Sequence, residues 1–276
     1  MTGEGGDRRA ARERARKARA RRGQAIAVVS SVVVLGGLAT AILTSSGWPD
    51  VRETFFSAES FRTNFPDILR GFWLDVKMFM AVEVIVLIFG LLIAVVRTTR
   101  NPALFPVRLL AAAYCDFFRG VPVILLIYLV GFGLPALELS GVPSDPIILA
   151  CLALSLAYSA YVAEVYRAGI RSIHPSQVDA ALATGLTRVQ ALRHVVLPQA
   201  VRRVRPPLLN DFISLQKDVA LVAVLGIADA FRLAQIESLS TFNYTPLLAA
   251  ASLYLLVTIP MARLLDHITD REEINS

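Results

Sequence analysis

ILRGFWLDVKMFMAVEVIVLIFGLLIAVV, residues Ile68–Val96, is a long run of apolar side chains with few charges in it. A helix needs about 20 such residues to cross the hydrocarbon core of a bilayer, so this run predicts a transmembrane helix. The whole chain supports that interpretation, because 55% of its 276 residues are hydrophobic. One water-soluble core does not bury that much apolar surface, which excludes an ordinary soluble globular protein.

Further apolar runs lie on both sides of this segment. On the N-terminal side, the basic run Arg8–Arg22 precedes Ala25–Thr44, whose length also matches a membrane span. A cleaved signal peptide is the competing interpretation, but its apolar region is normally shorter and no clear small-residue cleavage site follows here, which favours a retained anchor. On the C-terminal side, four more runs bring the prediction to six spans: Gly120–Leu137, Ile147–Glu164, Pro206–Ala228 and Pro246–Leu265.

The basic residues between the spans predict the orientation. With a cytoplasmic N-terminus, most arginines fall in inner loops, and this excess is the pattern that sets topology in membranes. Both chain ends then lie in the cytoplasm. The inner residues are Arg97, Arg100, Arg108, Arg119 and those from Arg167 to Arg205, whereas the outer loops hold only Arg52, Arg62 and Arg232.

Ionisable side chains occur inside two of the predicted spans. Lys77 and Asp75 are expected near the outer end of theirs, where a long side chain reaches the interface. Glu83, Asp211, Lys217 and Asp218 lie deeper, and charges at membrane depth usually face a protein interior or a water-filled path. They are candidates for the translocation path, although Lys217 and Asp218 are also candidates for a structural ion pair.

The chain shows no sign of its own catalysis or metal binding. Its two cysteines, Cys115 and Cys151, lie in apolar stretches without the spacing of a disulfide scaffold or a zinc site. A phosphate-binding loop of the form GxxxxGK[ST] is missing from the sequence. We therefore expect no catalytic residue, no metal site and no ATPase site in this chain.

The inner loop 173–207, IHPSQVDAALATGLTRVQALRHVVLPQAVRRVRPP, predicts two short helices. Ser176 followed by Asp179 has the spacing of a capping box, and Gly185 provides the left-handed residue that ends the first helix. Thr187 and Gln190 repeat the capping pattern for a second helix, which Pro198 is expected to stop. The result is a capped helical knob fixed to a span at each end.

Three uses of this knob are open. A DNA reader would place Arg188 and Arg193 near phosphates, but it needs a third helix and a soluble core, so we expect no nucleic-acid partner. A plain connection would not require caps on both helices. A rigid knob tied to two spans transmits the movement of a cytoplasmic partner into the membrane domain, and this third use is the one that the pattern favours.

At these residues the sequence resembles the permease subunits of ATP-binding-cassette (ABC) importers for polar amino acids. The family's Glu-Ala-Ala, Gly and Ile-x-Leu-Pro signature is matched by Asp179-Ala180-Ala181, Gly185 and Val195–Pro198 with the same spacing. The resemblance covers roughly residues 66–267. It includes Phe118–Pro122, Ala160-Tyr161-x-x-Glu164-x-x-Arg167, Pro198-Gln199-Ala200, Pro207-x-x-Asn210 and Lys217-Asp218.

The resemblance implies a fold, partners and sites. The fold is all-α, with an extra N-terminal helix added to a five-helix core of the type I importer permease. The implied partners are two cytoplasmic ATPase subunits, which use ATP and Mg²⁺, a second permease subunit (a paralogue or a copy of this chain), an extracytoplasmic solute-binding protein and the lipid bilayer. No cofactor is bound by the chain itself, and its location is the bacterial cytoplasmic membrane. The residues implied in ATPase coupling are Asp179, Ala180, Ala181, Leu182, Gly185 and Leu186, and Asn210 joins the candidates for the path.

The predicted organisation follows from these matches. A basic tail (1–24) precedes the extra span (25–44) and an outer segment (45–66). The permease core (67–267) contains the coupling loop (168–205), and a short cytoplasmic tail (268–276) follows. Lys217-Asp218 is followed by Val219-Ala220-Leu221 where relatives commonly carry Thr-Ser-Leu, so the chemistry of the path is expected to differ.

The substrate and the transport class are the remaining expectations. The basic tail, the extra span and the outer segment make this chain longer than compact relatives. This organisation is similar to that of one of two paired permeases in actinobacterial glutamate uptake, which implies a heterodimer and glutamate as the substrate, with glutamine or aspartate as alternatives. Glu164 and Arg167 lie one helical turn apart and are expected to form an ion pair. An ion-coupled secondary transporter is the alternative from another class, but it has no use for the knob.

Overall fold

The computed structural model describes residues 4–99 and 101–274. Arg100, predicted in an inner loop, lies outside the described residues, as do the chain ends. The chain divides into two compact units, Met1–Phe56 and Ser57–Ser276. This boundary falls before residue 67, where the transport core was expected to begin.

The first unit contains two helices. Helix α1 (Glu4–Leu43) includes all but the last residue of the predicted span Ala25–Thr44, and its segment Arg22–Leu43 is long and apolar enough to cross a membrane. Helix α2 (Trp48–Phe55) begins with proline near its first position, where a missing N–H costs no helical hydrogen bond. The predicted outer segment 45–66 therefore has helical structure of its own.

Helix α3 (Ala58–Thr98) opens the second unit and is longer than the run Ile68–Val96 that predicts it. The Ser57 side chain caps it by accepting a hydrogen bond from the Ser60 N–H at 3.3 Å. The Ser57 N–H donates to Thr245 Oγ1 at 3.0 Å, which ties the start of α3 to the start of α12 (Thr245–Ile274). The apolar run thus forms most of α3, and a more polar segment, residues 58–67, precedes it in the same helix.

The predicted span Gly120–Leu137 follows a sharp bend, and the helix before that bend was not predicted from the sequence. Helix α4 (Phe105–Gly120) follows the short 3₁₀ turn η1 (Pro102–Leu104). After Val121-Pro122 the chain turns by 105° into α5 (Val123–Tyr128), the π-helical turn η2 (Leu129–Gly133) and α6 (Leu134–Ala136). Pro122 cannot donate the next helical hydrogen bond, which accounts for a break at this point.

The C-terminal half has one unbroken span, one broken span and a final helix. Helix α7 (Pro146–Arg171) confirms the predicted span from Ile147. The predicted span Pro206–Ala228 is made of α10 (Leu197–Asp218) and the 3₁₀ helix η4 (Val219–Leu225), after which the chain bends by 53° into α11 (Ala230–Thr241). Helix α12 includes the last predicted span and extends beyond it.

Among the described residues, four helical segments are long and apolar enough to cross a membrane, or six if each bent pair counts as one span. The prediction of six spans is confirmed when each bent pair is counted as one span. The described residues contain helices and no strands, which confirms the all-α class.

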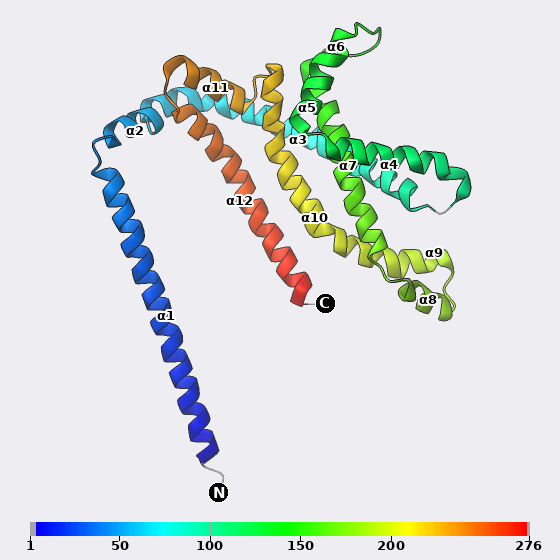
Figure 1. The fold of residues 1–276 in the computed structure, drawn as a ribbon, viewed down its shortest axis with the longest axis horizontal. Coiled ribbons are helices and arrows are strands. Elements are labelled where there is room, and N and C mark those ends of the chain that lie inside the picture. Colours follow the sequence, from blue (N-terminus) through cyan, green and yellow to red (C-terminus); the bar gives the residue numbers. More distant parts are fainter. Residues whose placement is uncertain (1–3, 100, 275–276) are drawn as a thin grey trace. The chain divides into compact units, whose positions relative to one another are not determined.

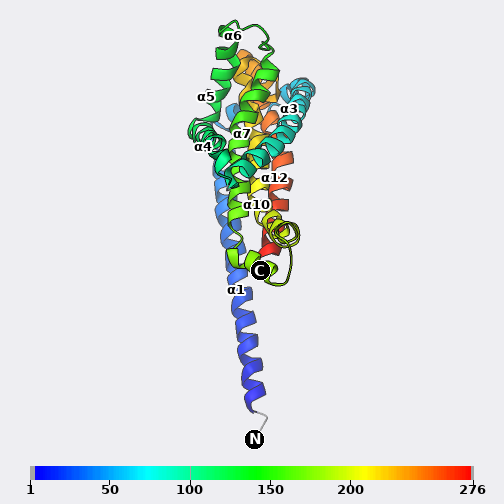
Figure 2. The same cartoon turned by 90° about the vertical axis from the view of Figure 1, so that its right-hand side faces the viewer.

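The second unit is organised as a row of helices crossed by α3. Helix α10 lies between α7 and α12, and α3 packs against all three (Figure 1). Between α7 and α10 come α8 (Pro175–Ala183), α9 (Arg188–Ala191) and the π-helical turn η3 (Leu192–Val196). Helices α8 and α9 lie beyond one end of the long helices α7 and α10, whereas α6 and α11 lie toward the opposite end (Figures 1 and 2).

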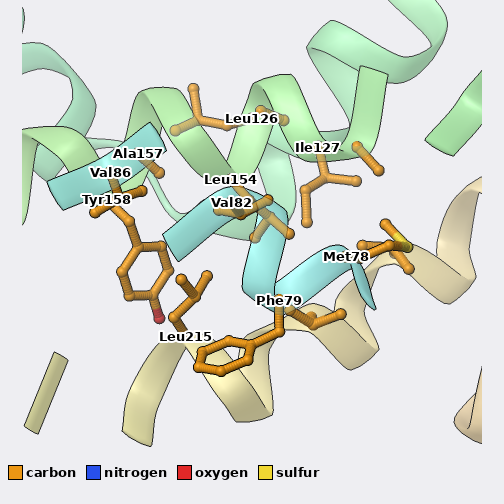
Figure 3. Close-up of a cluster of buried hydrophobic side chains, with 14 of the residues drawn as sticks. Met78, Phe79, Val82, Val86, Leu126, Ile127, Leu154, Ala157, Tyr158 and Leu215 are labelled. Atoms are coloured by element: carbon orange, nitrogen blue, oxygen red, sulfur yellow. The ribbon is translucent and has the colours of Figure 1, made fainter. Parts of the chain in front are cut away.

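The main core lies where α3, α5, α7 and α10 meet. Figure 3 shows Val82 and Val86 of α3 pointing toward Leu154 of α7, with Leu215 of α10 close by. All four are fully buried. Burying such a side chain from water stabilises a soluble fold by about 1.5–3 kcal/mol. Between helices in lipid, the stabilisation comes from close van der Waals packing instead.

Small residues let the helices approach closely. A methyl group added at Gly71 of α3 would lie 2.6 Å from the backbone nitrogen of Ala230 and 2.6 Å from the carbonyl carbon of Asp229. Close backbone approach of this kind is typical of helix packing in membranes. Gly71 therefore fixes how near α3 comes to the first turn of α11.

Gly71→Ala is expected to lower the free energy of unfolding by roughly 1–3 kcal/mol, because backbone atoms of α11 cannot move aside as a side chain does. Thermal unfolding of the purified protein in detergent measures this loss. Gly120→Ala is the matched control, since no atom lies within 4 Å of a methyl group added there. Equal stability of the two variants would show that the α3–α11 approach is not tight.

Candidate functional site

The coupling loop begins with α8, whose N-terminus differs from the prediction. The cap is His174, whose Nδ1 accepts from the Ser176 N–H at 3.2 Å and lies 2.7 Å from Ser176 Oγ. The expected capping box of Ser176 and Asp179 is therefore wrong: Pro175 takes the first helical position, and the helix starts two residues earlier than predicted.

The turn after α8 confirms the role predicted for Gly185. This residue has a φ of +87°, the left-handed region that glycine adopts without a steric penalty. Its N–H donates to the Leu182 carbonyl at 3.0 Å, and the Leu186 N–H donates to the Ala181 carbonyl at 3.2 Å. These bonds satisfy carbonyl groups that the end of a helix leaves free.

The second helix starts as predicted but does not stop at Pro198. The Gln190 N–H donates to Thr187 Oγ1 at 3.3 Å, and the Thr187 N–H donates to Gln190 Oε1 at 2.8 Å, which is a reciprocal capping box. The chain then passes through η3 into α10, with Pro198 in the first turn of α10. The wide π-helical turn accommodates a residue without an N–H, so the proline changes the helix without ending it.

Two contacts hold the base of the coupling loop against the spans. The Arg203 guanidinium donates a hydrogen bond to the Ser172 carbonyl, which joins α10 to the end of α7. A methyl group added at Gly169 would lie 2.1 Å from Cγ1 of Val204, so the two helices touch there. The base of the coupling loop is therefore held directly against α7 and α10.

The six residues implied in ATPase coupling differ in exposure. Asp179, Ala180 and Gly185 are exposed, and Leu182 and Leu186 are half-buried. Ala181 is buried within the chain. A partner would thus touch Asp179 and Ala180 directly, whereas Ala181 supports the turn through its carbonyl.

A pocket of about 380 Å³ lies between α7, α10 and the end of α4, on the side of the coupling loop. We call it the loop-end pocket. Its polar wall contains Arg119, Tyr161, Glu164, Arg203 and Asp211. These residues come from three sequence blocks that are far apart in the chain, and of the five only Asp211 was a predicted path residue.

Opposite charges line the loop-end pocket. The Arg119 guanidinium lies over the Tyr161 ring, 5.8 Å from its centroid, and has no salt-bridge partner among the described residues. Asp211 Oδ2 is buried without a hydrogen-bond partner in the described part of the chain. The guanidinium of Arg119 and the carboxylate of Asp211 thus lie within electrostatic range of each other without forming a salt bridge among the described residues.

Glu164 is the centre of an ion-pair network at the edge of this pocket. Its Oε2 accepts from Arg97 Nη1 at 2.7 Å, and the side chain also binds Arg167. The predicted pair of Glu164 and Arg167 is confirmed, with Arg97 of α3 as a third member that the sequence spacing did not indicate. The network ties α3 to α7.

The other predicted path residues do not gather at one place. Glu83 is buried in α3 within electrostatic range of Asp211. Asp218 accepts a hydrogen bond from the Tyr158 hydroxyl at 2.8 Å, while Lys217 and Asn210 are exposed. The expected Lys217–Asp218 ion pair is absent from the described residues, because neighbours on a helix point in different directions.

Asp75 does not reach out to solvent, as a side chain that extends to the interface would. The side chain is 3% exposed, and its Oδ2 accepts hydrogen bonds from the Tyr254 hydroxyl at 2.7 Å and the Ala230 N–H at 3.3 Å. Lys77 is exposed and lies 5.9 Å from the Trp73 ring centroid. The two charges in this turn of α3 thus have separate environments.

Comparison with known proteins identifies the family. Residues 86–273 match the family described as binding-protein-dependent transport system inner membrane component. The chain belongs to this family. The match includes the loop-end pocket and the whole coupling loop, so the permease is a multi-pass inner-membrane protein.

Curated relatives of the permease are named as permease proteins of amino-acid transport systems. It is 35% identical over 196 residues to the arginine transport system permease protein ArtQ of Bacillus subtilis (strain 168), covering 70% of this chain and 87% of the relative. It is 33% identical to the putative glutamine transport system permease protein GlnP of Rickettsia felis, covering 70% and 86%.

Solved structures agree with the fold. A crystal structure of an amino acid ABC transporter with histidines matches with a TM-score of 0.70 and 31% identity, covering 78% of this permease and 98% of that chain. An inward-facing structure of the MetNI methionine ABC transporter matches with a TM-score of 0.55 and 21% identity, which supports the fold alone. The permease is therefore a transmembrane subunit of an amino-acid ABC importer, and the family implies ATPase and binding-protein partners.

Proposed function

We propose that this permease forms half of the translocation path of an ATP-driven importer for a polar amino acid, and that its coupling loop docks on a separate ATPase. The observation that carries this proposal is the doubly capped knob of α8 and α9. Its Asp179 and Ala180 are exposed, while Arg203 and Gly169 fix its base. A rigid element of this kind passes the closure of a motor to the membrane helices.

The proposed orientation places the coupling loop and both chain ends in the cytoplasm. The end of α12 lies on the same side of the second unit as α8 and α9 (Figure 1). The arginines from Arg167 to Arg205 also lie at that end, in agreement with the excess of basic residues in inner loops. The end that carries α6 and α11 is then extracytoplasmic.

Glutamate is the first substrate to test, with glutamine and aspartate next. The loop-end pocket supports a carboxylate-bearing substrate, because Arg119 offers a guanidinium without an ion-pair partner in the described residues. Relatives are named for arginine and glutamine, so these two amino acids belong in the same panel.

The proposed assembly contains two copies of the ATPase, which bind ATP and Mg²⁺, and a second permease, proposed to be a paralogue. A solute-binding protein delivers the amino acid to the extracytoplasmic end. In this assembly the chain itself binds no cofactor and no nucleic acid.

Reconstitution with these partners tests the proposal. Proteoliposomes that contain the permease pair and the ATPase are expected to import radiolabelled L-glutamate, L-glutamine or L-arginine only with ATP and the binding protein. A variant of the ATPase that binds ATP but does not hydrolyse it is the control. Uptake that is driven by an ion gradient without the ATPase would overturn the proposal in favour of a secondary transporter.

A further inference from the structure

A second pocket, of about 470 Å³, lies at the end of the fold opposite the coupling loop. We call it the elbow pocket, because it forms where the broken span bends between η4 and α11. One wall comes from Tyr128 and Phe132, and the other comes from Gly226, Phe231, Arg232 and Gln235. The mechanism proposed above leaves this pocket without a role.

The backbone at the elbow is open and breaks the regular helix. Helix η4 is followed by its cap, Gly226, which has a φ of +78° and no atom within 4 Å of an added methyl group. Three residues later Asp229 caps α11 by accepting a hydrogen bond from the Arg232 N–H at 2.7 Å. Non-helical backbone inside a span is tolerated where it lines a water-filled cavity, so the elbow pocket is expected to hold water or a polar ligand.

Arg232 provides the charge of this pocket. The side chain is half-buried, and its Nη1 donates to Gln235 Oε1 at 2.9 Å. Among the described residues no carboxylate lies within salt-bridge distance of the guanidinium. Asp229, in the same turn, interacts electrostatically with Arg232 but forms no salt bridge with it; Asp229 is fully buried, and one of its oxygens is used by the cap. Most of the five N–H donors of Arg232 are therefore available to a ligand.

Aromatic rings complete the elbow pocket. Tyr128 and Phe132 lie one turn apart, with ring centroids 5.7 Å from each other, and Phe231 lies on the opposite wall. Both rings of the first wall are about half exposed. Apolar walls with one convergent cation are the composition of a site that binds a small anion-bearing ligand, since the walls strengthen its charge-assisted hydrogen bonds.

We propose that the elbow pocket is an entry site in which Arg232 binds the α-carboxylate of the amino acid as it leaves the binding protein. This inference rests on the proposed function, because it needs the α11 end to be extracytoplasmic. Every candidate substrate has an α-carboxylate, so the site acts before discrimination between side chains. The loop-end pocket then lies further along the same path, near the coupling loop.

The test compares three variants in the reconstituted importer. Arg232→Gln removes the charge but keeps a polar side chain, and Arg232→Lys keeps the charge. Arg62→Gln, an exposed arginine near the start of α3, is the matched control. Initial rates are measured with radiolabelled L-glutamate, L-glutamine or L-arginine at increasing concentrations of loaded binding protein. We expect kcat/KM to fall at least about tenfold for Arg232→Gln, to recover partly for Arg232→Lys and to stay unchanged for Arg62→Gln.

A second measurement separates the substrate from the binding protein as the ligand of Arg232. ATPase activity is recorded with empty and with loaded binding protein. If Arg232 binds the substrate, Arg232→Gln lowers only the additional stimulation by the loaded form. Equal loss with the empty form would overturn the proposal, since Arg232 would then contact the binding protein itself. Unchanged import by Arg232→Gln would also overturn it, while ATP-dependent import by the unaltered protein would leave the proposed function intact.

Discussion

Gly185→Val is expected to abolish stable association with the ATPase and to reduce ATP-driven import at least about tenfold. Gly185 has a φ of +87°, and a branched side chain in this region costs roughly 1–2 kcal/mol or more. The space around it is open, so no clash within the chain contributes. The cost falls on the turn that closes α8, where the Gly185 and Leu186 N–H groups hold the carbonyls of Leu182 and Ala181. Co-purification of the ATPase measures the effect.

Two controls separate the shape of the turn from a general loss of stability. Gly185→Asn should keep most of the association, because asparagine tolerates the left-handed region better than other residues with a side chain. Gly141→Val introduces the same strain at a φ of +88° in the connection from α6 to α7, at the opposite end of the second unit. Normal association of Gly185→Val, or equal loss in Gly141→Val, would show that the turn does not shape the docking surface.

Much of the fold follows from hydropathy, and the exceptions have a common cause. Spans such as α7 are long, apolar and continuous, so length alone predicts them. Helices α4 and α11 were missed because they are shorter and less apolar and lie directly before or after a bend. The bend at Pro122 has a chemical signal, the missing N–H. The bend at Gly226 is marked only by a glycine. Because glycine is also common inside unbroken transmembrane helices, it does not by itself predict a bend.

The candidate site divides in the same way. The caps of the coupling loop are local, so Gly185 and the Thr187–Gln190 box are readable from spacing of two to three residues. The loop-end pocket is not local, because Arg119, Tyr161 and Asp211 meet only when three helices pack. Lys217 and Asp218 illustrate the opposite error: adjacency in the sequence suggested a pair, but adjacent side chains on a helix diverge.

Glu164→Ala is expected to lower the free energy of unfolding by roughly 2–4 kcal/mol, because it leaves two arginines together without their counter-charge. The Arg97 and Glu164 side chains are only 14% and 21% exposed, so water does not replace the lost partner fully. Thermal unfolding of the purified permease in detergent measures the loss. Asp67→Ala is the control, since the Asp67–Arg70 pair is well exposed at 65% and 81% and is expected to contribute about 0–1 kcal/mol.

The double variant Arg97→Ala, Glu164→Ala shows whether the loss comes from the unpaired charge. Removing Arg97 together with Glu164 takes away one of the two stranded cations, so the double variant should be more stable than the sum of the two single changes predicts. Strict additivity would contradict a direct ion pair between α3 and α7. Because the same network borders the loop-end pocket, a coupled result would also mean that the pocket's wall is held in place by charge as well as by packing.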